Sequence, residues 1–169
     1  MPRRVSEPVF VAIKTVVVRE YRKHDLEAVV ALVGRSVRQI AGRDYDDHQI
    51  AVWAPEHPDM DAWADRLGFG TVLVAEEGER MAGFARLDEE GNIDLLYVGP
   101  AFERRGVAQR LVAKLTEIAK SLGFRRLHAD VSVTARPFFE AQGFEVVESQ
   151  SVERRGIAVK NYRMVWEEK

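Results

Sequence analysis

One feature limits the possible folds more than any other: a long amphipathic helix between two strand-like segments in the second half of the chain. An apolar run ends at Val98, hydrophobic residues recur at helical spacing from Val107 to Leu122, and the segment 125–131 alternates between apolar and polar residues. A helix that connects two strands of one sheet makes a crossover, and crossovers join parallel strands. The sequence therefore predicts a parallel pair within an α/β fold.

The other apolar segments are short and separated by turn residues, which is typical of antiparallel strands. We expect an α/β protein with a mixed, mostly antiparallel sheet of about six to seven strands and helices on both faces. The sheet should splay where the strand ending at Val98 and the strand at Val131 part. The remaining predicted strands are 9–20, 71–77, 80–88, 92–98, 145–153 and 157–167, and the further predicted helices are 24–40, two short pieces within 44–67, and 135–142.

Length and composition favour a single domain. With 169 residues, 46% of them hydrophobic, the chain suits a single domain over residues 1–169, with residues 1–8 as a candidate disordered segment. The net charge of -2 shows no broad basic surface, so we expect neither a nucleic-acid nor a membrane partner. Cysteine is absent, which fits the cytoplasm, and the four histidines lack ligand spacing, so we predict no metal site.

The turn before the long helix contains arginines and a glycine, in the sequence "FERRGVAQRLV". A helix N-terminus exposes unpaired N–H groups and carries partial positive charge, so this turn could hold a phosphate or pyrophosphate. Gly106 would let a ligand approach the backbone, and Arg104 and Arg105 would add charge. The alternative is an ordinary strand-to-helix turn with two solvated arginines. Nucleotide-triphosphate and dinucleotide motifs are both missing, because neither Gly-Lys-Ser/Thr nor the further glycines are present.

Two motifs in order make the pattern specific. "LLYVGPAFERRGVAQRLV" is followed by "SVTARPFFEAQGF", and together with the order of strands and helices they resemble the GNAT superfamily of acyl-CoA-dependent N-acetyltransferases. The resemblance spans nearly the whole chain and is strongest from Leu95 to Phe144. The C-terminal part, "TARPFFEAQGFEVVESQSVERRGIAVKNYRM", is similar to an uncharacterised bacterial subgroup, in which Asn161 and Met164 would either stabilise the terminal hairpin or contact an acceptor.

What the resemblance implies is an acetyl-CoA site and transfer of an acetyl group to an amine. Backbone groups of Leu96, Tyr97 and Val98 would line the pantetheine arm and the thioester, and the amides from Arg104 to Gln109 would surround the pyrophosphate. The residues expected to contact this cosubstrate are Leu96, Tyr97, Val98, Arg104, Arg105, Gly106, Val107, Ala108, Gln109, Ser132 and Phe139.

Three positions depart from the pattern of the family. Glu103 stands where Gln or Arg is usual, and an anion there would disfavour a pyrophosphate unless its side chain points away. Ser132 replaces the usual Asn and has a shorter reach. Phe139 replaces the Tyr that in many members protonates the departing thiolate, so another group or water must supply that proton.

The expected chemistry is direct attack of an amine on the thioester, polarised by a strand amide such as that of Val98. A primary amine is mostly protonated at neutral pH, so a base or a water relay is needed. Asp94 is the first candidate for the base, and His128 could serve as base or acid. Tyr97 and Tyr162 are candidate substitutes for the missing tyrosine. Each of these side chains could equally have a structural role on its strand.

The acceptor site is expected in the segment from Asp44 to Asp65, which holds seven carboxylates and no Lys or Arg. Tyr45, Trp53 and Trp63 are interleaved with them, and an acidic aromatic surface would attract a cationic amine. A solvated helix face with buried tryptophans is the alternative.

Several functional alternatives stay open at this point. The acceptor could be a small-molecule amine, a protein N-terminus or a lysine. With Phe139 and Glu103 in place, the chain could also be a non-catalytic acyl-CoA-binding regulatory module, and a plain interaction domain is a third hypothesis. Formation of a homodimer is likewise left open.

Overall fold

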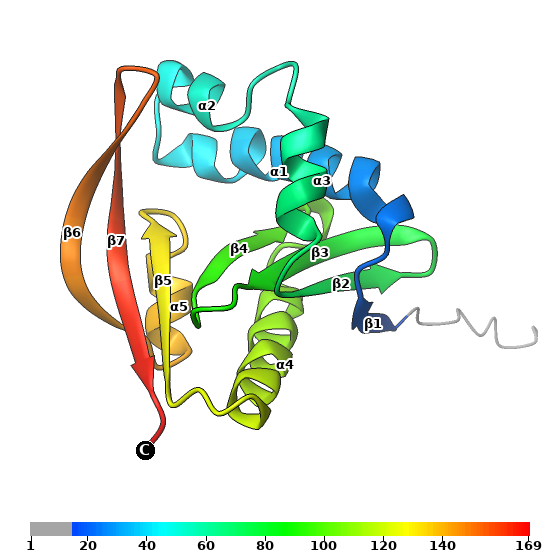
Figure 1. Ribbon diagram of the computed structural model, residues 1–169. Helices are drawn as coiled ribbons and strands as arrows, with labels where there is room; N and C mark the ends of the chain where they lie inside the picture. Colours follow the sequence, from blue (N-terminus) through cyan, green and yellow to red (C-terminus); the bar gives the residue numbers. More distant parts are fainter. Residues whose placement is uncertain (1–14) are drawn as a thin grey trace, which may run out of the picture.

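Two antiparallel sheets form the framework of the computed structural model, which describes residues 15–169. The first sheet has the order β1-β2-β3-β4 and the second the order β5-β7-β6. Figure 1 shows the long β6–β7 hairpin standing beside β5, away from the first sheet. The strands are β1 (Val16–Glu20), β2 (Thr71–Glu77), β3 (Arg80–Leu87), β4 (Ile93–Val98), β5 (Arg126–Ser132), β6 (Glu145–Arg154) and β7 (Ile157–Glu167).

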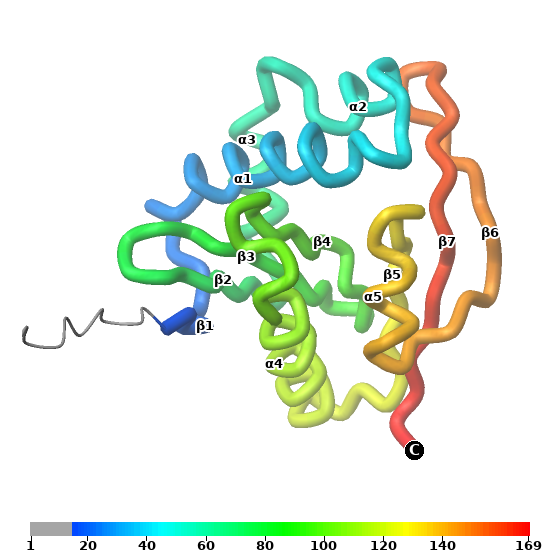
Figure 2. The backbone as a smooth tube through the Cα atoms, turned by 180° about the vertical axis from the view of Figure 1, so that it is seen from behind, coloured from blue at the N-terminus to red at the C-terminus, as the bar shows by residue number. Residues whose placement is uncertain are grey.

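Helices cover both faces of the first sheet, because each of its strands carries apolar side chains on both sides. On one face α1 packs Val29 and Val33 near Phe84 of β3, and on the other α4 packs Leu111 and Leu115 near Leu87. Figures 1 and 2 show α1 and α4 on opposite sides of the sheet. The helices are α1 (Leu26–Gln39), α2 (Asp47–Trp53), α3 (Met60–Leu67), α4 (Val107–Ser121) and α5 (Arg136–Ala141), with short 3-10 turns η1 (Lys23–Asp25), η2 (Ala41–Arg43) and η3 (Pro100–Phe102).

A glycine brings the start of α4 against the sheet. A Cβ at Gly83 of β3 would lie 2.7 Å from the carbonyl oxygen of Tyr97 and 3.1 Å from a side-chain atom of Val107. Real Cβ atoms almost never make the first of these contacts. The missing side chain therefore lets the N-terminus of α4 sit directly beside the end of β4.

An ion-pair network ties β1 and β2 to the entrance of α1. Asp25 is 5% exposed, and its carboxylate accepts hydrogen bonds from both terminal nitrogens of Arg19, at 2.8 and 2.9 Å, and from the amide of Arg22 at 2.7 Å. Arg19 also pairs with Glu76 of β2. The hydrogen bonds from Arg19 lower the pKa of Asp25 below its usual value, against the opposing effect of burial.

The two sheets meet at one parallel bridge and then separate. Asn92 pairs with His128 in parallel, and the amide of His128 donates to the carbonyl of Gly91 at 3.0 Å. Beyond this bridge β4 and β5 belong to different sheets, so their carboxyl ends diverge. The predicted parallel contact and the predicted splay are both confirmed.

The divergence leaves backbone groups of β4 available. The amide of Gly99 donates to the carbonyl of Ala82 at 2.8 Å, which makes these two residues a hydrogen-bonded pair across β3 and β4. In an antiparallel ladder, hydrogen-bonded pairs alternate with non-hydrogen-bonded pairs. Leu96 and Val98 belong to non-hydrogen-bonded pairs, so their N–H and C=O groups point away from β3, toward the splay.

The predicted fold class is confirmed, with seven strands in two antiparallel sheets. The first predicted strand began at Val9, and its residues before 15 lie outside the described part, as does the candidate disordered segment 1–8. The irregular region 44–67 contains the two expected short helices, α2 and α3. Between residues 15 and 169, none of the helices has both the length and the hydropathy to cross a bilayer. The division into domains stays a prediction.

Candidate active site

A groove of about 660 Å³ opens where β4 and β5 diverge. Its walls come from the end of β4, the first turn of α4, the end of β5, α5 and the C-terminal end of α1. Of the residues predicted to contact the cosubstrate, all except Arg105 line this groove: Leu96, Tyr97, Val98, Arg104, Gly106, Val107, Ala108, Gln109, Ser132 and Phe139.

The turn into α4 presents backbone amides to the groove. Gly106 has a φ of 78° and Arg104 a φ of 60°, so two residues of this turn are left-handed. The first amides of a helix have no carbonyl partner within it, and alternating backbone conformations gather such amides into an anion-binding concavity. A Cβ at Gly106 would meet nothing within 4 Å, so the space above this residue is open. The geometry suits a pyrophosphate held by backbone amides.

The turn into α4 that presents these amides is here called the cradle. Glu103 is compatible with a pyrophosphate in the cradle because an arginine neutralises its carboxylate. Arg43 of η2 donates to both carboxylate oxygens of Glu103, at 2.6 and 2.9 Å, and this hydrogen bonding lowers the pKa of Glu103. Arg105 does not line the groove: its guanidinium pairs with Glu77 and lies over the ring of Phe102, 5.1 Å from the centroid. Its contact with the cosubstrate stays a prediction.

A second cavity of about 380 Å³, here called the acceptor pocket, adjoins the groove. It lies between β4, β5 and the β6–β7 hairpin, with α2 and α3 contributing at its edge. Six residues line both cavities and are called the junction: Trp53, Ile93, Asp94, Tyr97, Asp130 and Ser132. Reactants held in the two cavities would meet at these residues.

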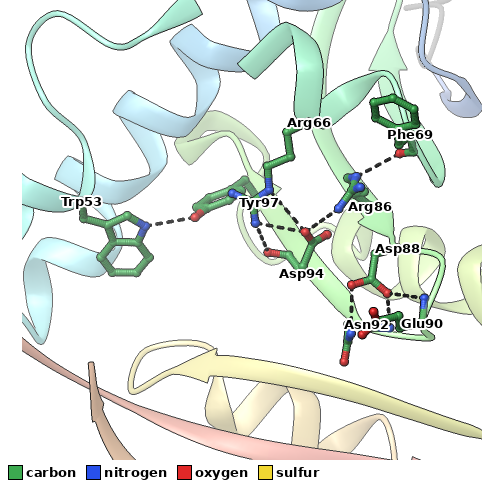
Figure 3. A network of polar contacts seen from close by, with 9 residues as sticks. All are labelled: Trp53, Arg66, Phe69, Arg86, Asp88, Glu90, Asn92, Asp94 and Tyr97. Atoms are coloured by element: carbon green, nitrogen blue, oxygen red, sulfur yellow. Dashed lines mark hydrogen bonds and ion pairs between the residues drawn. The ribbon is translucent and has the colours of Figure 1, made fainter. Parts of the chain in front are cut away.

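Tyr97 places a protonated hydroxyl at the junction. Its ring stacks on Phe84 at a centroid distance of 5.6 Å, and its hydroxyl oxygen accepts a hydrogen bond from the indole nitrogen of Trp53 at 3.0 Å (Figure 3). Burial raises the pKa of Tyr97. The phenol therefore stays neutral at physiological pH, and its own proton is available for donation.

Asp94 is held by two guanidinium groups, as Figure 3 shows. One carboxylate oxygen, Oδ2, accepts from Arg86 at 2.5 Å and from Arg66 at 3.0 Å. The other oxygen, Oδ1, is buried and has no hydrogen-bond partner within residues 15–169. The two arginines occupy Oδ2, so Oδ1 is the carboxylate oxygen with no partner.

The strand β5 contributes His128 to the acceptor pocket and Ser132 to the junction. The hydroxyl oxygen of Ser132 accepts from the amide of Ala135 at 3.0 Å, which leaves its O–H free to donate. Phe139 is 4% exposed and packs edge-on against Phe138 and Phe144, yet it reaches the wall of the groove. It contributes shape but no proton. The other candidate tyrosine, Tyr162, lines neither cavity.

The aromatic part of the predicted acceptor site comes together, whereas the acidic part does not. Tyr45 and Trp53 contact edge-to-face at 5.3 Å and line the acceptor pocket. Trp63 packs against the core cluster of α1 instead and lines neither cavity, so the structure does not bring it together with Tyr45 and Trp53. None of the seven carboxylates between residues 44 and 65 lines either cavity. Two of them, Asp46 and Asp59, cap α2 and α3.

Sequence reasoning missed the basic and amide groups around the acceptor pocket. Arg66, Arg154 and Arg163 line it, and Arg86 supports Asp94 from its edge. These residues come from α3, β3, β6 and β7, so no local motif gathers them. A cationic partner for Glu103 could have been predicted, because a carboxylate beside a pyrophosphate site needs a compensating positive charge. The structure shows that this partner is Arg43.

Comparison with known proteins agrees with this geometry. The acetyltransferase (GNAT) domain model matches residues 41–166, and the chain belongs to this family of acetyltransferases. An uncharacterised N-acetyltransferase of Escherichia coli K12, YafP, is 35% identical over 147 residues, which cover 87% of this chain and 93% of the relative. The expectation of an acetyltransferase enzyme is thereby confirmed.

Solved structures share the fold over almost the whole chain. A GCN5-related N-acetyltransferase from Rhodopseudomonas palustris has a TM-score of 0.87 at 29% identity, covering 93% of this chain and 98% of its own. The PaiA N-acetyltransferase from Thermoplasma acidophilum, solved in complex with coenzyme A, has a TM-score of 0.76 at 16% identity, covering 90% and 99%.

Proposed function

We propose that the enzyme moves the acetyl group of acetyl-CoA to a primary amine by direct attack at the junction. The supporting observation is that groove and acceptor pocket share the six junction residues, so a donor in one and an acceptor in the other are brought together. Holding two reactants in contact removes much of the entropic barrier of a bimolecular step. The proposal includes a bacterial, cytoplasmic setting, which the absence of cysteine fits.

The residues of the groove suit acetyl-CoA, which supplies the thioester that the amine attacks. The amides from Val107 to Gln109 and the open space at Gly106 would hold the pyrophosphate, and Arg104 adds a positive charge. The amide of Val98, directed into the splay, would donate to the thioester carbonyl oxygen and stabilise the charge that develops there. The Thermoplasma structure of the same fold is a complex with coenzyme A, which supports a CoA ligand for this fold.

Tyr97 takes the role of the missing tyrosine in this proposal. As the C–S bond breaks and the N–C bond forms, the sulfur leaves as a thiolate, and the neutral phenol of Tyr97 gives it a proton. The indole of Trp53 fixes the orientation of that phenol. Ser132, with its free O–H, is the second donor at the junction.

In this proposal Asp94 orients the amine and His128 accepts its proton. Oδ1 of Asp94 accepts a hydrogen bond from the amine and orients it, because Oδ2 is already occupied by two arginines. His128 lines the acceptor pocket and receives the proton of the incoming ammonium through water.

The test begins with titration calorimetry of acetyl-CoA and CoA into the wild type and Gly106→Glu. The matched control is Gly156→Glu, since Gly156 has the same φ of 78°, also faces open space, and lies in the β6–β7 turn outside both cavities. We expect affinity to fall at least about tenfold in Gly106→Glu alone. Equal behaviour of the two variants would refute the cradle.

Turnover is then measured as release of free CoA thiol with a panel of small amines and of peptides bearing a free N-terminus or a lysine. Acetylation of one of these classes identifies the acceptor type. An acetyl-CoA complex that transfers to no amine in the panel would contradict the proposed reaction.

A further inference from the structure

Three arginines and three aspartates line the acceptor pocket: Arg66, Arg154 and Arg163, with Asp88, Asp94 and Asp130. Arg86 bonds to Asp94 from outside the lining. A pocket for a simple cationic amine would present an excess of negative charge, which this wall lacks. An arginine of the wall without a carboxylate partner would suit an anionic group on the bound molecule.

The three aspartates of the pocket wall are already engaged by the protein. Asp88 accepts from the amides of Glu90 and Asn92 and from the side-chain nitrogen of Asn92, all within its own turn (Figure 3). Asp130 accepts from Gln150 at 2.8 Å and from Arg163 at 3.4 Å. Asp88 and Asp130 are therefore held by protein groups, whereas Asp94 keeps one oxygen, Oδ1, without a partner among the described residues.

Arg154 is the arginine that these carboxylates do not reach. Within the part of the chain from residue 15 onward, no carboxylate lies within 4.0 Å of its guanidinium. The side chain of Arg154 is exposed to solvent at the end of β6, and it lines the acceptor pocket together with Tyr97 of the junction. Burial raises the pKa of Tyr97, and the positive charges of Arg154 and Arg66 both oppose that rise.

Two buried oxygens in the same pocket lack donors. Oδ1 of Asp94 and Oδ1 of Asn161 have no hydrogen-bond partner among the described residues, and both residues line the acceptor pocket. Buried acceptors are nearly always satisfied in native proteins, and an amine carries the N–H donors that both could use. Asn161 thus lies in this pocket with an unpartnered oxygen, which fits the acceptor contact that the sequence left open.

We propose that the acceptor is an amino acid or a close analogue, with its amino group at Asp94 and Asn161 and its carboxylate at Arg154. This inference rests on the proposed acetyl transfer and names its substrate class. Polyamines, which add positive charge, fit this pocket poorly.

Binding is tested apart from turnover, by titrating matched pairs into protein saturated with CoA. The pairs are leucine with isoamylamine, phenylalanine with 2-phenylethylamine, lysine with cadaverine, and histidine with histamine; each amine lacks only the carboxylate. We expect at least one amino acid to bind about tenfold or more tightly than its amine, as one charge-assisted contact provides. In Arg154→Gln this ratio should approach one. The control Arg155→Gln alters the neighbouring exposed arginine, which lines neither cavity, and should keep the ratio.

Three results would overturn the inference: amines that bind as tightly as amino acids in every pair, a preference that survives in Arg154→Gln, or no binding by any compound of the panel. The same compounds are assayed separately for CoA release. Amino acids that bind with the expected preference but are never acetylated would refute the proposed function while leaving the carboxylate site established.

Discussion

Replacing Tyr97 by Phe removes the proton that the proposed mechanism delivers to the sulfur while keeping the ring. General acid catalysis by a positioned side chain contributes roughly 10²–10⁴ in rate, or about 3–5 kcal/mol of the barrier. We expect kcat to fall by roughly this factor, with little change in acetyl-CoA binding, because the stacking on Phe84 is retained. The assay is CoA release under saturating substrates.

The same substitution has a predictable effect on stability. It leaves the indole N–H of Trp53 without its partner at 3.0 Å, in a partly buried position. An unsatisfied donor costs about 1–3 kcal/mol when buried, and we expect the lower end here because both residues are partly exposed. Trp53→Phe breaks the same hydrogen bond but keeps the hydroxyl, so it separates the loss of stability from the loss of the acid. Urea denaturation of both variants measures this cost.

The pH profile and a rescue variant complete the test. Since burial raises the pKa of Tyr97, ionisation of this residue should not reduce the wild-type rate below about pH 10. Adding Phe139→Tyr to Tyr97→Phe restores a phenol on the wall of the groove and should recover part of the lost rate. An unchanged kcat in Tyr97→Phe would refute the assignment of Tyr97 as the acid.

Two further predictions concern charged pairs. Arg43→Gln leaves the carboxylate of Glu103 uncompensated beside the cradle, so acetyl-CoA affinity should fall about tenfold and should recover in the double variant Arg43→Gln, Glu103→Gln, as titration calorimetry will show. If the double variant binds no better than the single one, the pair does not shield the site. Asp25→Asn should destabilise the fold by about 2 kcal/mol at pH 7, because it breaks a buried ion pair whose arginine keeps a second partner, Glu76. The folded-state pKa of Asp25 is lowered, so its contribution is full above the unfolded value of about 3.9 and is lost as pH falls through the folded value. Denaturation at pH 7 and pH 3 should therefore show the variant and wild type converging at the lower pH; a constant difference would contradict the linkage.

The periodicity of the sequence and its resemblance to the GNAT family together predicted the fold. The helical stripe of α4 and the alternation of β5 are local patterns, and together they specify the crossover that places Asn92 beside His128. The geometry of the cradle could also be predicted from the sequence, because the positive φ at Gly106 and the first amides of α4 depend on neighbouring residues only. What a short segment determines by itself could be predicted.

The charges of the active site could not be predicted in this way. Arg43 and Glu103 are 60 residues apart, and Asp94 meets arginines 28 and 8 positions away. Trp53 and Trp63 look alike in the sequence, yet one faces the pocket and the other the core, because α2 and α3 pack differently. Such pairings depend on how separate elements dock, and that information is spread over the whole chain.

The two cavities are built from different parts of the chain, and this has an evolutionary consequence. The cradle belongs to β4 and α4, whereas Arg154, Asn161 and Arg163 come from a hairpin that pairs only with β5 and with itself. Tyr45 ties that hairpin to the rest of the site by donating to the carbonyl of Lys160 and accepting from the amide of Val133. If the proposed function holds, mutations in the hairpin would change which amine is accepted and leave the acetyl-CoA site unaltered. Acceptor choice and cosubstrate binding could then vary independently in one fold.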